Sequence, residues 1–311
     1  MDGFFSAIAD VLSNDITYSG AVRFAALLAF CACGETIAER AGTLNISVEG
    51  MILGGAFAGA TGYHVTGSVA VGLLWSVAAG LLVALIHANL SHRLSANTFV
   101  VGLTLNILVL GTSAFLAKYV DPSTRAAHKI SVPILNDIPL VGDAFFNQPW
   151  PLYLLYPLIP LCWWLLYRTR WGLEIRAVGE NPQSADVSGI DINKRRRQGV
   201  YVSGMTSGLG GGYLILGQIG RFDDAMVGGQ GFIAIAAVIF GGWTLRGAIA
   251  GCLLFGAVNS FRLSLPALGH QANPELLSAL PFLVTIFTMM IFAHRTREPR
   301  ALAKPFIRGL K

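Results

Sequence analysis

The polar side chains that could carry chemistry gather at the junction of two apolar runs. Three ionisable residues close the first run and three polar residues open the second: Glu35, Glu39, Arg40, Asn45, Ser47 and Glu49. The dipole would favour Glu49 in a first helical turn, and Arg40 could pair with either neighbouring carboxylate. Polar groups inside an apolar segment are costly and therefore informative. They indicate either a structural pin for a helix hairpin or part of a pathway.

Known catalytic and metal-binding motifs are missing from the sequence. It has no Gly-x-x-x-x-Gly-Lys-Ser/Thr phosphate loop, no His-Glu-x-x-His and no Gly-x-Ser-x-Gly. The six histidines are scattered, and the four cysteines fit buried small hydrophobic residues. Cys31 and Cys33 lie two apart in an apolar helix, so they face different sides and cannot share a metal or a disulfide. We therefore expect no catalytic residue, no metal and no cofactor on this chain.

The composition assigns the chain to the integral membrane proteins. Hydrophobic residues make up 54% and charged residues 13% of it, against roughly 25% charged residues in a soluble domain. Apolar spans are predicted at 20–37, 47–63, 68–88, 98–117, 150–167, 200–217, 230–245, 247–263 and 280–293. Several are shorter than the ~20 residues of a straight bilayer crossing. We expect an all-α polytopic membrane protein with about nine spans, in the range of roughly eight to ten.

Clustered basic residues give the expected orientation. The net charge of +5 comes largely from a polar island at 168–198 and a tail at 294–311. The positive-inside rule places both in the cytoplasm. Alternating outward from the island then places the N-terminus outside. Because the cations serve topology, no nucleic-acid partner is expected.

A weak internal repeat links the two halves of the chain. Val48-Glu49-Gly50-Met51-Ile52 and Gly229-Gln230-Gly231-Phe232-Ile233 each open a short segment rich in glycine and alanine. These segments are the second and the seventh predicted spans, so their order along the chain differs by five, an odd number. The two halves of the chain, at about 18–150 and 151–295, would therefore have opposite orientations in the membrane. Inverted repeats with short or broken helices indicate a transport pathway at the repeat interface. Chance matching in glycine- and alanine-rich sequence is the alternative.

The pathway is expected beside 45–60 and 230–243. Its candidate residues are Asn45, Glu49, Met51, Asn106, Gln230, Phe232 and Trp243. Asn106 lies in mid-span, where an amide either bridges helices or faces a polar lumen. Met51, Phe232 and Trp243 would either offer apolar or stacking surface to a base or sugar ring or serve helix packing.

The polar island contains start and stop signals for a helix of about two turns. Asn181 reads as its N-cap, Pro182 suits the first helical position, and Gly189 can take the left-handed conformation that closes it. Such a helix is too short to be stable alone in water. It must therefore be held by its own protein or by a second one.

These motifs resemble the permease subunits of ATP-binding cassette (ABC) importers in the branched-chain amino acid and simple-sugar permease family. Within that family the nucleoside/simple-sugar branch is the most similar. In the first half the resemblance rests on Gly34-Glu35-x-x-Ala38-Glu39-Arg40-Ala41-Gly42-x-x-Asn45-Ile46-x-Val48-Glu49-Gly50-Met51. In the second half it rests on Arg176-Ala177-Val178-Gly179-Glu180-Asn181-Pro182, Ala185, Gly189 and Gly231-Phe232-Ile233-x-Ile235-Ala236. Two departures are Ser47, where the family usually has glycine, and Ala96-Asn97-Thr98, which replaces a more usual Asp-Gln pair.

The resemblance implies one transmembrane domain, 1–311, of inverted five-helix halves in a bacterial inner membrane. It also implies three protein partners. They are a second homologous permease, expected to form a heterodimer with this one, a cytoplasmic ATPase that holds ATP and Mg, and a periplasmic or lipid-anchored binding protein. Membrane lipid is also expected to contact the chain. The coupling helix that seats in the ATPase would comprise Gly179, Glu180, Asn181, Pro182, Ala185, Asp186 and Gly189. The expected substrate is first a nucleoside, second a simple sugar such as a pentose, and third a riboflavin-like ring compound.

A stand-alone channel or ion-coupled carrier is the alternative from another class. Such a protein would not need the capped two-turn helix in 168–198. The predicted spans also lack the carboxylate or histidine relays that proton-driven carriers use. The sequence therefore favours a transport subunit that borrows its energy from an ATP-hydrolysing partner.

Overall fold

The fold is seen in a computed structural model of the chain. The structure describes residues 10–11, 13–120, 122, 124–131, 138, 142–269, 273–292 and 297–306. The helices of the first half are α2 (Asp15–Arg40), α3 (Val48–Thr66), α4 (Val69–His92), α5 (Thr98–Val120) and α6 (Gly142–Phe146). The second half begins with η1 (Trp150–Leu154), α7 (Leu155–Arg168), α8 (Arg170–Glu180) and α9 (Pro182–Val187). It continues with α10 (Ile192–Tyr213), the π-helical η2 (Leu214–Ile219), α11 (Gln230–Phe240), α12 (Leu245–Ala267) and α13 (Pro274–Phe292).

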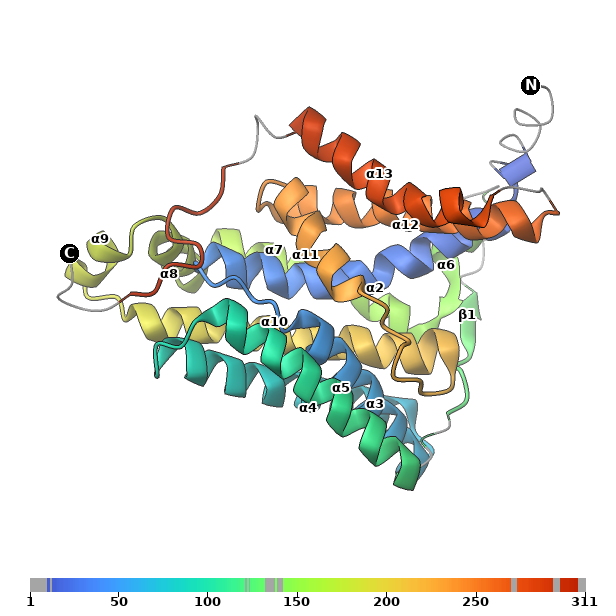
Figure 1. The fold of residues 1–311 in the computed structure, drawn as a ribbon, viewed down its shortest axis with the longest axis horizontal. Helices are drawn as coiled ribbons and strands as arrows, with labels where there is room; N and C mark the ends of the chain where they lie inside the picture. The colour runs from blue at the N-terminus through green and yellow to red at the C-terminus, as the bar shows by residue number, and fades with distance from the viewer. Residues whose placement is uncertain are drawn as a thin grey trace.

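The long helices lie side by side with their ends at two opposite poles (Figure 1). At one pole lie α8, α9 and the C-terminal residues 297–306. At the other lie α6 and the strand β1 (Lys129–Ser131). The basic island and the described part of the basic tail are therefore at the same end of the bundle.

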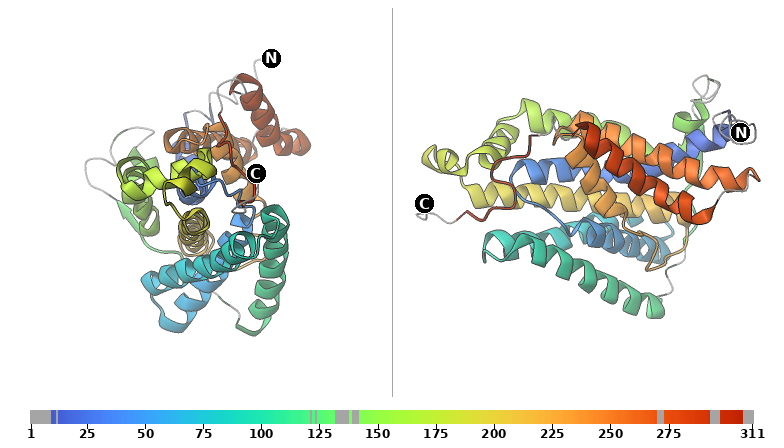
Figure 2. Two further views of the ribbon diagram at one scale, coloured as in Figure 1. Left: turned by 90° about the vertical axis from the view of Figure 1, so that its left-hand side faces the viewer. Right: turned by 45° about the horizontal axis from the view of Figure 1, so that its top comes forward.

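The centre of the bundle is formed by α2 and α10, as the end-on view shows (Figure 2). Along α10, every fourth residue from Gly204 to Gly212 is a glycine, so α4 can approach its backbone closely. A Cβ added at Gly80 of α4 would collide with the carbonyl oxygen of Gly204, and one at Gly208 with that of Ser76. Small residues at this spacing are the usual means of close helix contact in membranes. They place α10 between α4 on one side and α2 on the other.

The structure corrects the prediction of an all-α protein in one place. β1 pairs with β2 (Asn147–Pro149) in an antiparallel ladder, with Ile130 opposite Gln148. The connection between the halves must return to the bundle at this pole, and pairing satisfies its backbone N–H and C=O groups. The Trp150 N–H extends the contact by donating to the carbonyl oxygen of His128. The described part of the chain is thus mostly helical with one small two-stranded sheet.

Each of the nine predicted apolar segments coincides with a helix in the part of the chain that the structure describes. Among the described residues, five helical stretches are long and apolar enough to cross a membrane: Asp15–Arg40, Val69–His92, Thr98–Val120, Trp150–Arg168 and Leu245–Ala267. The prediction of short apolar helices is confirmed most clearly by α11, which has 11 residues. This protein is a multi-pass membrane protein.

Candidate functional site

The first turns of α3 and α11 meet inside the bundle, and one carboxylate joins them. Glu49 Oε1 accepts a hydrogen bond from the Gly229 N–H and Glu49 Oε2 accepts one from the Gly231 N–H, both at 2.7 Å. A Cβ at Gly231 would lie only 2.7 Å from the Glu49 backbone nitrogen, so the two backbones touch. The positive ends of two helix dipoles thus face one acidic side chain, which stabilises both.

Asn106 bridges helices, which is one of the two roles predicted for an amide at its mid-span position. Its Oδ1 accepts from the Gly50 N–H at 2.8 Å, and its Nδ2 donates to the Ile46 carbonyl oxygen at 2.9 Å. The oxygen and the nitrogen of the Asn106 side-chain amide therefore both fix α5 against the start of α3. The amide supplies partners for backbone groups that the helix terminus leaves unpaired.

A buried hydrogen-bond network lies beside this junction. The Asn45 side chain donates to Glu35 Oε2 and to Ser203 Oγ, each at 3.0 Å, and Ser203 Oγ donates to Glu35 Oε2 at 2.7 Å. Ser47 Oγ donates to Asn45 Oδ1 at 2.7 Å and lies 2.8 Å from His87 Nδ1. All five side chains are fully buried. The network joins α2, α4 and α10 to the loop 41–47, so these polar residues pin the helix hairpin.

Replacing Asn45 by leucine should destabilise the fold strongly. Leucine fills a similar volume but leaves Glu35 and Ser47 buried with fewer partners, at a cost of about 3 kcal/mol. Thermal unfolding of the purified protein in detergent would measure it. Asn89→Leu is the matched control, because Asn89 Nδ2 bonds only to Leu85 O of its own helix, and it should shift stability by less than about 0.5 kcal/mol. Equal melting temperatures for the two variants would contradict the pinning role.

The expected pairing of Arg40 with a neighbouring carboxylate is wrong. Arg40 Nη1 instead lies 3.6 Å from Glu180 Oε1, and Arg40 Nε donates to the Trp243 carbonyl oxygen at 2.7 Å. The Trp243 indole N–H donates to Glu39 Oε2. Trp243 adopts a left-handed backbone conformation, with φ +54°, in the turn between α11 and α12. These contacts tie the end of α2 to α8 and to that turn, which no sequence spacing reveals.

The remaining candidate pathway residues differ in their exposure. Met51 is fully buried and packs with residues of α4, α5 and α10. Phe232 is 43% exposed on α11. Gln230 is half-buried at the start of the same helix, between the two glycines that Glu49 contacts. The structure therefore brings Asn45, Glu49 and Met51 together with Asn106, while a role for any of them toward substrate stays a prediction.

The predicted helix in the polar island is present as α9. Asn181 Oδ1 accepts from the Ser184 N–H at 3.0 Å, so Asn181 caps the helix, and Pro182 occupies its first position. Gly189 follows with φ +82°, in the left-handed region expected of it. The inward-facing Ala185 is 3% exposed. The helix is therefore held by its own protein along one side, while Glu180 and Gly189 lie at the surface.

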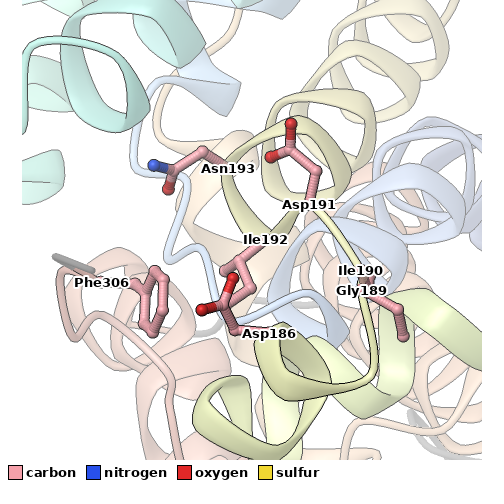
Figure 3. A pocket seen from close by; sticks show the side chains of 7 residues that line it. All are labelled: Asp186, Gly189, Ile190, Asp191, Ile192, Asn193 and Phe306. Carbon is pink, nitrogen blue, oxygen red and sulfur yellow. The ribbon is translucent and has the colours of Figure 1, made fainter. Parts of the chain in front are cut away.

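A pocket of about 330 Å³ lies between α9 and the C-terminal residues. Figure 3 shows the Phe306 ring beside Asp186 of α9, with Asn193 of α10 above them in the view. Ile192 packs in the same apolar cluster as Ala185, with Phe306 against it. The C-terminal segment is thus part of the surface around the short helix.

No cluster of histidine, cysteine and carboxylate side chains with metal-binding geometry is found among the residues that the structure describes. The four cysteines are free and buried, as their apolar neighbours predict. Two members of the buried hydrogen-bond network, Ser203 and His87, were not among the candidate residues predicted from the sequence. A signal existed for Ser203, since it is a polar residue in a glycine-rich helix, but only the fold shows that it faces Glu35.

Comparison with known proteins shows the family to which this chain belongs. Residues 17–289 match the family described as branched-chain amino acid transport system / permease component. The chain belongs to this permease family. It is accordingly the transport subunit of an ABC transporter and not the ATPase.

Relatives of this permease align over nearly its whole length. It is 35% identical to the guanosine ABC transporter permease protein NupQ of Bacillus subtilis, with 92% of this chain and 94% of the relative covered. It is 34% identical to the putative glucose ABC transporter permease protein TsgC13 of Haloferax volcanii, covering 91% and 93%. It is 32% identical to the nucleoside ABC transporter permease protein NupC of Lactococcus lactis, covering 96% and 97%. The relatives are thus nucleoside and sugar permeases, at similar identity.

Proposed function

We propose that this permease is the membrane subunit of an ATP-driven importer for nucleosides. The observation that carries the proposal is its similarity to two nucleoside or guanosine permeases over more than nine-tenths of its length. The similarity to a glucose permease supports a simple sugar as the second candidate. The Glu49 junction supports a transport pathway between the halves, because it joins two short helix starts inside the bundle.

The packing supports the inverted repeat of the halves at about 18–150 and 151–295. Helix α4 lies along α10, and its counterpart α12 lies along α2. The pairs α2 and α10, α4 and α12, and α5 and α13 run in opposite directions (Figures 1 and 2). Short α3 and α11 occupy matching places. In this arrangement all nine apolar helices enter the membrane, and α3 and α11 begin within it.

The orientation follows from the shared pole of the basic segments. With 168–198 and 297–306 at one end of the bundle, the positive-inside rule assigns that end to the cytoplasm. The start of α2 then lies outside, in the inner membrane of a bacterial cell. This arrangement puts α9 where a cytoplasmic ATPase, loaded with ATP and Mg, could receive it as the coupling helix.

The complex we propose contains a second, homologous permease, that ATPase and an external binding protein. Helix α5 exposes a row of large apolar side chains: Phe99, Leu103, Ile107 and Leu110. Such a face is covered either by membrane lipid or by the second permease. The binding protein would deliver the nucleoside to the end of the bundle formed by β1 and α6.

Weakening the cap of α9 should uncouple ATP hydrolysis from uptake. Asn181→Ala removes the acceptor for the Ser184 N–H, which costs about 1 kcal/mol of helix stability, enough to populate a frayed helix at the contact. We expect a lower ratio of substrate transported to ATP hydrolysed in proteoliposomes. Asn181→Asp, which retains a capping oxygen, should restore the ratio. A helix-breaking Ala185→Pro variant with unchanged coupling would reject the assignment of α9.

The substrate is tested by reconstituting the permease with its homologous partner, ATPase and binding protein. Labelled guanosine, glucose and a pentose are supplied outside, with ATP inside or absent. ATP-dependent uptake of guanosine that other nucleosides compete and glucose does not is the expected result. Uptake of a sugar alone would favour the second candidate. Uptake that persists without ATP would favour a channel or ion-coupled carrier.

A further inference from the structure

Residues 297–306 lie at the pole of the bundle that carries the short helix α9 (Figure 1). There residues 299–306, which we call the strap, hydrogen-bond to two other elements through their backbone. The Ala301 N–H donates to the Gly179 carbonyl oxygen at 2.9 Å, at the end of α8, and the Ala303 N–H donates to the Gly42 carbonyl oxygen at 3.1 Å. The strap therefore links α8 to the loop 41–47.

A buried arginine holds the strap in place. Arg196 of α10 is 1% exposed, and its guanidinium donates to the carbonyl oxygens of Lys304, at 2.7 Å, and Ala301, at 3.3 Å. Neither of the two ion pairs found among the described residues includes Arg196. A buried cation that lacks a carboxylate depends on such acceptors, since an unpaired buried charge is strongly destabilising. Arg196 and the strap therefore stabilise each other.

The strap also contacts the short helix. The Phe306 side chain packs against the buried cluster formed by Val178 of α8, Ala185 of α9 and Ile192 of α10. Figure 3 shows its ring beside Asp186 of α9. In the middle of the strap, Ala303 adopts φ +58°, a conformation that a non-glycine residue rarely takes without support. The support is its bond to Gly42, where an added Cβ would lie 3.0 Å from Arg196 Nη2.

We propose that the strap positions α9 relative to the loop 41–47, with Arg196 as the residue that fixes it, so that movement of α9 reaches α3. This inference rests on the proposed function, because it assumes that α9 receives the force of ATP hydrolysis. The loop 41–47 runs directly into α3, whose Glu49 holds α11. The strap contacts this loop through the Ala303 N–H and, through Phe306, the apolar cluster that includes Ala185 of α9. Its basic residues serve topology, while its backbone and Phe306 serve coupling.

The test uses the whole reconstituted complex and the variant Arg196→Gln. We expect the ratio of substrate transported to ATP hydrolysed to fall about fivefold or more, the low end of ordinary coupling between sites. The matched control is Arg197→Gln, which makes the same change of charge at the next position. The Arg197 Nε donates only within its own helix, to the Asn193 carbonyl oxygen, so this variant should couple as the wild type does.

Hydrogen exchange gives a second measurement that does not depend on transport. In Arg196→Gln the amides of Ala301 and Ala303 should exchange faster, and in Arg197→Gln they should not. Lys304→Ala should change exchange and coupling much less than Arg196→Gln does, because Arg196 contacts the carbonyl oxygen of Lys304, while the Lys304 side chain makes only an exposed hydrogen bond to the Arg300 carbonyl oxygen. Deleting 299–311 should reproduce the loss of coupling while the ATPase still binds the permease.

The outcomes separate the strap from the proposed function. If the wild-type complex transports without any dependence on ATP, the proposed function fails, whatever the variants do. If the wild type couples normally and Arg196→Gln keeps both its coupling ratio and the slow exchange of Ala301 and Ala303, the strap proposal alone is overturned. Faster exchange with unchanged coupling would also overturn it, because the strap would then be structural only.

Discussion

Uptake should fall at least about tenfold when Glu49 is replaced by alanine, while ATP hydrolysis continues. Glu49 accepts two hydrogen bonds from the start of α11, from the Gly229 and Gly231 N–H groups. Hydrogen bonds to a charged group contribute about 1.5–3 kcal/mol each, and a loss of ~1.4 kcal/mol already changes an equilibrium tenfold. Without the carboxylate the two helix starts would separate. We therefore expect that the contact between the first turns of α3 and α11 no longer responds to ATP hydrolysis, so that hydrolysis continues without uptake.

Graded variants sharpen this prediction. Glu49→Gln keeps the length of the side chain and one acceptor oxygen, so its uptake should lie between those of the wild type and alanine. Glu275→Ala is the matched control, because Glu275 also occupies the first turn of a helix but is exposed. Measurements of labelled substrate uptake and phosphate release in the same proteoliposomes give both quantities. Wild-type uptake by Glu49→Ala would show that the junction between α3 and α11 does not gate transport.

Gly208→Ala should prevent correct assembly of the bundle. An added Cβ would collide with the Ser76 carbonyl oxygen and would lie 3.0 Å from the Gly80 Cα. Both are backbone atoms, so relief requires the whole of α4 to move away from α10. Overpacking of this kind costs about 3 kcal/mol, and it would also disturb the Ser203 contact one turn earlier. We expect poor yield, aggregation on size exclusion and a lower melting temperature.

The control for this prediction is Gly111→Ala. Gly111 lies in α5, and a Cβ there meets no atom within 4 Å. Replacing glycine by alanine in a helix then favours the folded state by up to about 1 kcal/mol. Gly111→Ala should thus melt at or slightly above the wild-type temperature. If Gly208→Ala were as stable as Gly111→Ala, α4 and α10 would not be in backbone contact.

Local signals in the sequence predicted most of the helices of this protein. Runs of apolar residues predicted nine segments that each coincide with a helix among the described residues, because long apolar runs are expected to enter a bilayer as helices. The cap, proline and glycine of 181–189 predicted α9, because capping depends on residues within one or two turns. The small sheet formed by β1 and β2 was missed, since three-residue strands are too short to show a period.

Tertiary structure alone decided how the polar residues pair. Arg40 bonds to Glu180 and Trp243 rather than to its sequence neighbours, and Ser203 meets Glu35 across the bundle. The tail 294–311 read only as a topology signal, yet its described part binds Arg196. Such contacts join residues far apart in the chain. They depend on the distance and angle between packed helices. The spacing of residues along a single helix does not determine either quantity.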